Sequence, residues 1–140
     1  MNFAFSTGSA AIGLPNDGAW GAAYGSMLGR NGYIIAGITD INGDPTKPFD
    51  ALGNILDDRE FFSSVEIGWT TSQKQIMLDN AHVTVWHKSS QDSTQTDSGY
   101  GIAFSLSRYF NENFMPFVRG GYAKDAGTLL QKSLSLGMGY

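Results

Sequence analysis

The sequence predicts an all-β protein with one antiparallel arrangement of about seven strands. Three observations favour this fold class. Gly supplies 18 of the 140 residues, and Gly inside a helix costs about 1 kcal/mol relative to Ala, which disfavours a helical bundle. Aromatic residues make up 13% of the chain and charged residues 16%, whereas disordered chains are rich in charge and poor in aromatics. Apolar residues also recur with period two, the spacing that places them on one face of a strand.

The first four predicted strands cover residues 20–28, 32–39, 61–71 and 81–89. Strand 20–28 sets Trp20, Ala22 and Tyr24 against Gly21, Ala23 and Gly25. Strand 32–39 is apolar on both faces, so its orientation stays open. In strand 61–71, Val65, Ile67 and Trp69 lie on one face, and Glu66 with small residues lies on the other. In strand 81–89, Val83 and Val85 lie on one face and a mainly polar set lies on the other.

The last three predicted strands cover residues 99–109, 115–122 and 131–140. Strand 99–109 has the clearest alternation, with Tyr, Ile, Phe and Leu on one side and Gly, Ala and Ser on the other. Strand 131–140 repeats it, and strand 115–122 is short. Each of the seven runs is near the ~9–11 residues with which a tilted strand crosses a bilayer.

The connections indicate a hairpin ladder with two different ends. Arg30-Asn31-Gly32 contains Asn-Gly, a strong signal for a tight hairpin turn. The connections that follow alternate in length: 41–59 is long, 73–79 is shorter than it, 90–98 is longer than 73–79, 111–113 is short again, and 123–130 is intermediate. Short turns at one end and longer loops at the other are typical of outer-membrane barrels.

Two features of the strand faces favour a transmembrane β-barrel over a soluble two-sheet sandwich. In three of the runs, Gly, Ala and Ser form the face opposite the apolar one, where a sandwich usually presents long polar side chains to water. A barrel interior tolerates small residues because it holds water or loops. Aromatic residues also stand near strand ends, as in the girdles at membrane interfaces. They are Trp20, Phe61, Trp69, Tyr100, Tyr109, Phe110, Tyr122 and Tyr140.

Seven strands cannot close such a barrel, because bacterial single-chain barrels have an even number of strands and at least eight. We therefore expect a partial barrel, a single domain over residues 1–140 that continues in a longer exported chain. The N-terminal stretch lacks the positive region of a secretory signal peptide. The formal net charge of −4 disfavours nucleic-acid binding, which requires clustered Lys and Arg.

Several segments, in this order, resemble the carbohydrate-selective outer-membrane porins, the family that includes the glucose-inducible porins. The resemblance covers nearly the whole chain. The segments are AFSTGSAAIGLPNDGAWGAAYG (4–25), GITDINGDPTKPFD (37–50), VEIGWT (65–70), HVTVWH (82–87), GYGIAFSLSRYF (99–110) and MPFVRGGYA with LLQKSLSLGMGY (115–140). The resemblance implies the C-proximal part of a sixteen-stranded barrel in the outer membrane of a Gram-negative bacterium, with passive diffusion of small sugars. Its partners would be outer-membrane lipid, carbohydrates in the lumen and the remaining strands of the parent chain; a homotrimer is one option.

Five polar or aromatic residues are candidates for lining the pore. Arg119 is mid-strand, where a lipid-facing charge would cost about 2–4 kcal/mol, so it is expected to point inward. The same alternation places Glu66, His82 and Lys88 inside. An equally weighted interpretation is that these four form an ion-pair network that braces the wall. Trp86 shares their face and either stacks on sugars or, as the favoured alternative, packs in the girdle or against a loop.

No catalytic motif, cofactor site or metal site is predicted. His82 and His87 are five residues apart and so point to opposite faces of one strand, which excludes a His-x-His pair. The stretch beginning Asp40-Ile41-Asn42 imitates a calcium loop but has Pro45 and Ala51 where Gly and Glu are needed, so a turn is expected there.

Two alternatives stay open: a soluble β-sandwich that binds carbohydrate, and a small complete barrel with an eighth strand in residues 2–6.

Overall fold

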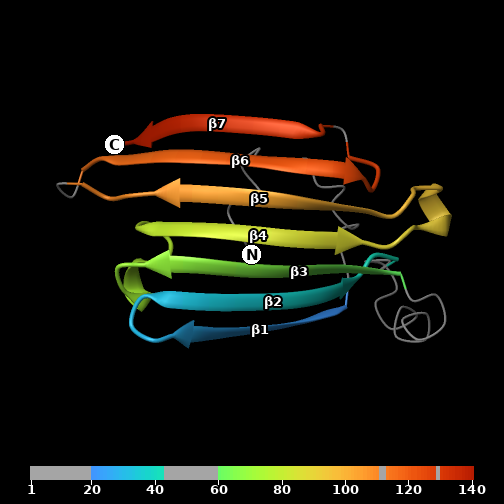
Figure 1. Ribbon diagram of the computed structural model, residues 1–140, viewed down its shortest axis with the longest axis horizontal. Helices are drawn as coiled ribbons and strands as arrows, with labels where there is room; N and C mark the ends of the chain where they lie inside the picture. Colours follow the sequence, from blue (N-terminus) through green and yellow to red (C-terminus); the bar gives the residue numbers. More distant parts are fainter. Residues whose placement is uncertain (1–19, 43–59, 111–112, 129) are drawn as a thin grey trace.

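The protein is an up-and-down antiparallel sheet. The structure, a computed structural model, describes residues 20–42, 60–110, 113–128 and 130–140. Its strands are β1 (Gly21–Leu28), β2 (Gly32–Asp40), β3 (Phe61–Thr70), β4 (Asn80–Lys88), β5 (Gly99–Ser107), β6 (Met115–Asp125) and β7 (Lys132–Gly139). They lie in chain order in one sheet, each antiparallel to its neighbours (Figure 1). This confirms the predicted all-β, seven-stranded antiparallel fold.

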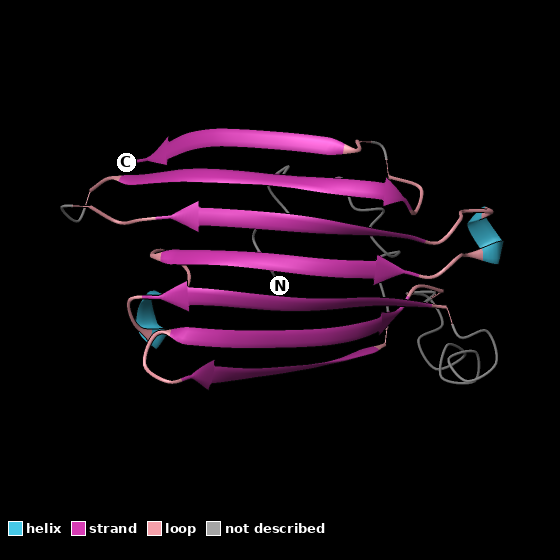
Figure 2. Cartoon of the chain, viewed as in Figure 1, coloured by secondary structure: helices cyan, strands magenta, loops and turns pink. Residues whose placement is uncertain are grey.

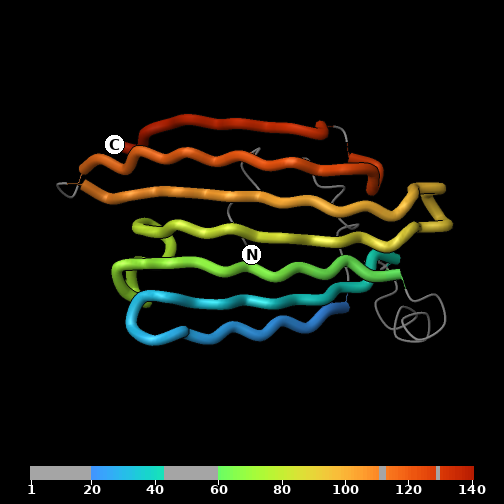
Figure 3. Tube along the Cα trace, in the orientation of Figure 1, coloured from blue at the N-terminus to red at the C-terminus, as the bar shows by residue number. Residues whose placement is uncertain are grey.

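The sheet is open among the described residues, with β1 and β7 at its two edges (Figure 3). An open sheet of this kind is consistent with part of a barrel. Residues 2–6, where the alternative of a small complete barrel needs an eighth strand, lie outside the described residues. None of the helices in the described ranges is long and apolar enough to span a membrane.

The strand bounds differ most from the expected ones in β6. It extends three positions beyond the predicted end at Tyr122, because Ala123, Lys124 and Asp125 continue the ladder opposite residues 99–101 of β5. β5 ends at Ser107 rather than at Tyr109.

The turn between β1 and β2 is not the predicted Asn-Gly turn. Gly32 pairs with Leu28 inside the ladder, so the turn consists of residues 29–31. Gly29 has φ +73°, a left-handed conformation that glycine adopts without steric cost. Asn31 has a different role: its Nδ2 donates to the carbonyl oxygens of Thr70 at 2.8 Å and Thr71 at 3.0 Å, which ties the turn to the end of β3.

The predicted order of short and long connections is only partly correct. The turn end of the sheet, as we call it, carries connections 29–31, 71–79 and 108–114, and the loop end carries 41–60, 89–98 and 126–131. The connection 126–131 is no longer than 108–114, so the alternation fails at the last pair. Short 3₁₀ helices lie in two connections, η1 (Gln73–Gln75) and η2 (Asp92–Thr94) (Figure 2). The turn expected at Asn42, Gly43 and Pro45 falls largely outside the described residues.

The register gives the sheet two distinct faces. Directly paired residues share a face, so Ile67, Val83 and Phe104 form one row across β3, β4 and β5. We call this side the apolar face; most of its large side chains are exposed, for example 40% for Phe104 and 75% for Leu136. We call the other side the covered face. Most of its described residues on β4 and β5 are buried, including Thr84 and Ala103.

The small residues of the covered face make room for aromatic rings of neighbouring strands. A Cβ added to Gly68 would stand 2.2 Å from Cζ of Tyr33, and the two residues pair directly across β2 and β3. Trp86 covers Gly101 in the same way across β4 and β5. Phe117 of β6 likewise covers Gly137 of β7. Rings of neighbouring strands therefore lie over these three glycines, so the small residues of the covered face also permit close aromatic packing.

Candidate functional site

The covered face holds a buried polar cluster centred on Glu66 of β3. The Tyr33 hydroxyl donates to Glu66 Oε1 at 2.8 Å, and the Thr84 hydroxyl donates to Glu66 Oε2 at 3.0 Å. Tyr33 and Thr84 stand on β2 and β4, the strands on either side. Both carboxylate oxygens are thus engaged by neighbouring strands, and Glu66 bridges three strands.

Asn80 and His82 extend this cluster along β4. Asn80 Nδ2 donates to the Tyr33 hydroxyl at 2.8 Å and to the carbonyl oxygen of Ile76 at 2.8 Å. His82 Nδ1 lies within hydrogen-bond distance of Asn80 Oδ1 and 3.9 Å from Glu66 Oε1. Because an amide oxygen can only accept, Nδ1 is the donor in this contact. Nε2 is buried and has no hydrogen-bond partner within the described residues.

Arg119 of β6 lies in the same row of the covered face as His82. Its guanidinium carbon stands 4.6 Å from the centre of the Phe117 ring, and its Nε donates to the Ser105 hydroxyl at 3.3 Å. The register defines this row, since Ser105 pairs directly with both His82 and Arg119. Arg119 is half-buried, which leaves it the most accessible of the five candidate residues.

Trp86 is packed into the sheet and does not present an open ring. It is 3% exposed, stacks on Phe62 with ring centres 5.8 Å apart, and forms an apolar cluster with Ala123 and Ala126. Gly101 lies beneath it. A sugar ring has no accessible indole face to stack on, so the packing interpretation of Trp86 accounts for it better than sugar stacking.

Lys88 ends β4 and contacts a loop. It is 5% exposed, and its Nζ donates to the Thr96 hydroxyl at 3.4 Å. The loop 89–98 that carries Thr96 also docks on the start of the 41–60 connection, where Gln91 Nε2 donates to the carbonyl oxygen of Ile41 at 2.9 Å. Glu60 joins the same contacts by accepting from Asn42 Nδ2 at 2.6 Å. Lys88 thus lies against a folded loop.

The structure places all five candidates on one face, as the alternation predicts. Glu66 and His82 lie together in one cluster, and Arg119 lies two strands away in the row of His82. Trp86 and Lys88 lie farther along β4, near the loop end, and do not belong to this cluster. Sequence reasoning missed Tyr33 and Asn80. Strand 32–39 is apolar on both sides, so its alternation does not show which side chains lie on the covered face. The pairing of Tyr33 with Gly68 would have placed Tyr33 on that face.

Nine aromatic residues lie at or near the two ends of the sheet, whereas Tyr24 and Phe104 lie in mid-strand. Trp69, Tyr109, Phe110, Phe114 and Tyr140 lie at the turn end, and Trp20, Phe61, Tyr100 and Tyr122 lie at or near the loop end. Most are more than a third exposed. The apolar rows of the strands lie between these two groups.

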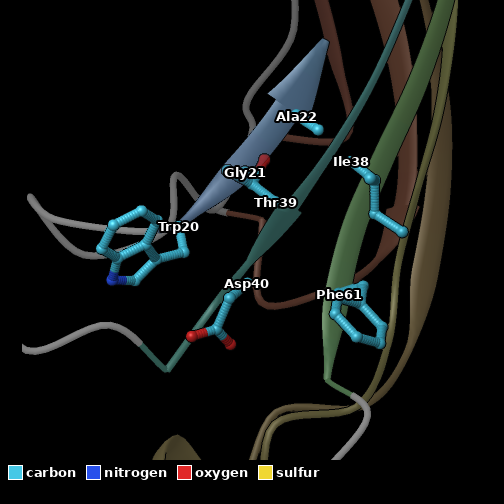
Figure 4. Close-up of a pocket in the computed structure, with 7 residues that line it drawn as sticks. All are labelled: Trp20, Gly21, Ala22, Ile38, Thr39, Asp40 and Phe61. Atoms are coloured by element: carbon cyan, nitrogen blue, oxygen red, sulfur yellow. The ribbon is translucent and has the colours of Figure 1, made fainter. Parts of the chain in front are cut away.

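Metal binding can be assessed from the grouping of ligand side chains among the described residues. They contain no group of three or more His, Cys, Asp or Glu residues that could hold a metal ion. A pocket at the start of β1 is lined mainly by apolar groups around Asp40 (Figure 4). Its lining residues are Trp20, Gly21, Ala22, Ile38, Thr39, Asp40 and Phe61.

Comparison with known proteins gives no match: no family model, no curated protein and no solved structure is similar to the chain.

Proposed function

We propose that this chain forms part of an outer-membrane porin through which small carbohydrates diffuse passively. The observation that carries the proposal is the apolar face. Its rows of Val, Ile, Leu and Phe run across the sheet, remain exposed, and end at aromatic groups on both sides. A soluble monomer rarely exposes a continuous apolar surface of that extent, whereas barrel strands turn such a band to lipid between two aromatic girdles.

Strand length and hydrogen bonding agree with this placement. The strands contain 8 to 11 residues, close to the ~9–11 of a tilted membrane strand. Within a bilayer, every backbone amide and carbonyl needs a protein partner. The outer edges of β1 and β7 have none among the described strands, so further strands of the same barrel would have to pair with them.

A soluble β-sandwich is the main alternative. A sandwich needs a second sheet on the apolar face, since its core forms between two inner faces. All seven strands of the described residues belong to one sheet, and Leu134 and Leu136 on that face are 68% and 75% exposed. These features favour the membrane barrel.

The carbohydrate part of the proposal rests on the resemblance of the quoted segments to carbohydrate-selective porins. Selectivity in such a channel comes from pore width and lining hydrogen-bond groups. Arg119 is the candidate that best fits a contact with a passing solute, because it is half-buried while Glu66, His82, Trp86 and Lys88 are buried. We therefore assign the other four a bracing role in the wall.

Liposome swelling tests the proposal. The protein that carries this sequence is reconstituted into phosphatidylcholine liposomes, which are diluted into isotonic glucose, sucrose or raffinose. We expect fast swelling in glucose and slower swelling as the sugar grows, compared with protein-free liposomes. Swelling equal to that of protein-free liposomes in all sugars would contradict a channel, and a monodisperse protein that unfolds cooperatively without detergent would support the sandwich.

A further inference from the structure

Two lysines stand together on the apolar face near the loop end. Lys124 on β6 and Lys132 on β7 are both exposed. Tyr122 pairs directly with Lys132, and Lys124 follows Tyr122 by two residues on the same face. The lysines are therefore diagonal neighbours on adjacent strands, about 7–8 Å apart. Side chains of that length allow both ammonium groups to contact a single anion.

No ion pair joins either lysine to a carboxylate of the described residues, and Asp125, which follows Lys124 in β6, pairs with Gly99 on the opposite face. Among the described strand residues of β3 to β7, the apolar face carries no Asp or Glu. The chain as a whole has a formal net charge of −4, so a pair of unopposed lysines on its most apolar side is a local exception. Their position favours an anionic partner.

The surroundings of the lysines are suited to an amphiphile. Tyr100 pairs with Lys124 and is 53% exposed, and Tyr122 beside Lys132 is 39% exposed. Both phenols can donate a hydrogen bond to an oxyanion. Toward the middle of the sheet the face becomes apolar at once, with Ile102 and Leu134 in the next positions along β5 and β7, both exposed.

We propose that Lys124, Lys132, Tyr100 and Tyr122 form a docking surface for the phosphate headgroup of a membrane lipid, whose acyl chains lie along Ile102 and Leu134. The proposal rests on the proposed function, because only a bilayer presents headgroup and chains in this order. Lysines near a bilayer interface extend their ammonium groups to the headgroup level. The aromatic group at the loop end marks that level. The surface thus combines a charge for the headgroup with a wall for the chains.

Lipid binding in micelles of a non-ionic detergent tests the proposal. Native mass spectrometry measures the apparent affinity of the chain for phosphatidic acid, with phosphatidylcholine as the neutral comparison. We expect preference for phosphatidic acid, and a loss of about fivefold in affinity for each lysine replaced in Lys124→Gln and Lys132→Gln. The charge-preserving variant Lys124→Arg/Lys132→Arg should retain binding. Arg108→Gln is the matched control, since Arg108 is an exposed cation at the opposite end, beside Phe110.

Three results would overturn the docking surface: unchanged affinity in the double glutamine variant, an equal loss in Arg108→Gln, or inorganic phosphate binding as tightly as the lipid. Failure of the proposed function has a separate readout. The unsubstituted chain and each variant are mixed with pure phosphatidylcholine vesicles and centrifuged in a density gradient, where a protein inserted in the membrane floats with the vesicles. This measures membrane insertion without anionic lipid. If the unsubstituted chain fails to float, the membrane barrel is contradicted. If it floats but shows no preference for phosphatidic acid over phosphatidylcholine, only the docking surface is contradicted.

Discussion

Replacement of Gly68 by Ala tests the packing of aromatic rings over glycines on the covered face. The added Cβ would stand 2.2 Å from Cζ and 2.4 Å from the hydroxyl oxygen of Tyr33, closer than non-bonded atoms approach. Tyr33 is 2% exposed, and its hydroxyl links Glu66 to Asn80. The ring has to move, and both hydrogen bonds are disturbed when it does.

The magnitude follows from two contributions. Overpacking of a filled site costs about 1–3 kcal/mol. A hydrogen bond to a charged group contributes about 1.5–3 kcal/mol and one to a neutral group about 0.5–1.5 kcal/mol. When the ring moves, the clash is relieved but the hydrogen bonds are weakened, so the two costs are not fully additive. We therefore expect Gly68→Ala to lower the free energy of unfolding by about 2–4 kcal/mol.

Guanidinium unfolding in lipid vesicles, followed by tryptophan fluorescence, measures this change. Gly25→Ala is the control, because Gly25 also lies in a strand but an added Cβ would meet Ile35 at an ordinary 3.5 Å. We expect that control to change stability by less than about 1 kcal/mol.

The clash itself is tested by a double-mutant cycle with Tyr33→Val. If the ring is the obstacle, Gly68→Ala should cost little in the Tyr33→Val background, and the coupling energy should account for most of the single-mutant loss. A Gly68→Ala loss no larger than that of Gly25→Ala, or a coupling near zero, would refute the reasoning.

Three further substitutions are measured by the same unfolding assay. Glu66→Ala leaves the hydroxyls of Tyr33 and Thr84 without this acceptor and should cost about 2–5 kcal/mol, whereas Glu66→Gln keeps one acceptor oxygen and should cost less than half as much; equal losses would contradict the bridging role of the carboxylate. Gly29→Ala meets no atom within 4 Å but retains φ +73°, so it should cost about 1–2 kcal/mol from backbone conformation alone, and no loss would show that the turn changes shape. Leu134→Arg should cost about 2–4 kcal/mol in vesicles if this face contacts lipid, while a change within about 0.5 kcal/mol would indicate that Leu134 faces water.

Alternation was sufficient to predict the sheet, because strand faces follow a period of two whatever the neighbouring strands are. It identified β5 and β7 best, where one side is consistently large and the other consistently small. It failed to orient β2, whose two sides are both apolar, and so it missed Tyr33. It also ended β6 too early, since Ala123 and Lys124 do not differ from loop residues in composition; only their pairing with β5 shows that they continue the strand.

The candidate site was predicted as a face and not as a cluster. Parity placed Glu66, His82 and Arg119 on one side, but it contains no information on which strands are neighbours at which register. Register places Thr84 opposite Glu66 and Ser105 between His82 and Arg119. The turn at residues 29–31 was misassigned for a related reason: Asn31 directs its side chain to the end of β3, a contact between residues far apart in the sequence.

The packing of rings over glycines changes which observation supports a channel. A row of Gly and Ser suggests a spacious, wet interior only if nothing from neighbouring strands covers it. Here Tyr33, Trp86 and Phe117 lie over the glycines that face them, so small residues on the covered face are also what close aromatic packing requires. That face alone would suit a soluble core as well as a barrel wall. The proposal of a membrane barrel therefore depends on the opposite face, and the Leu134→Arg measurement, which probes that face directly, discriminates more sharply than any substitution on the covered side.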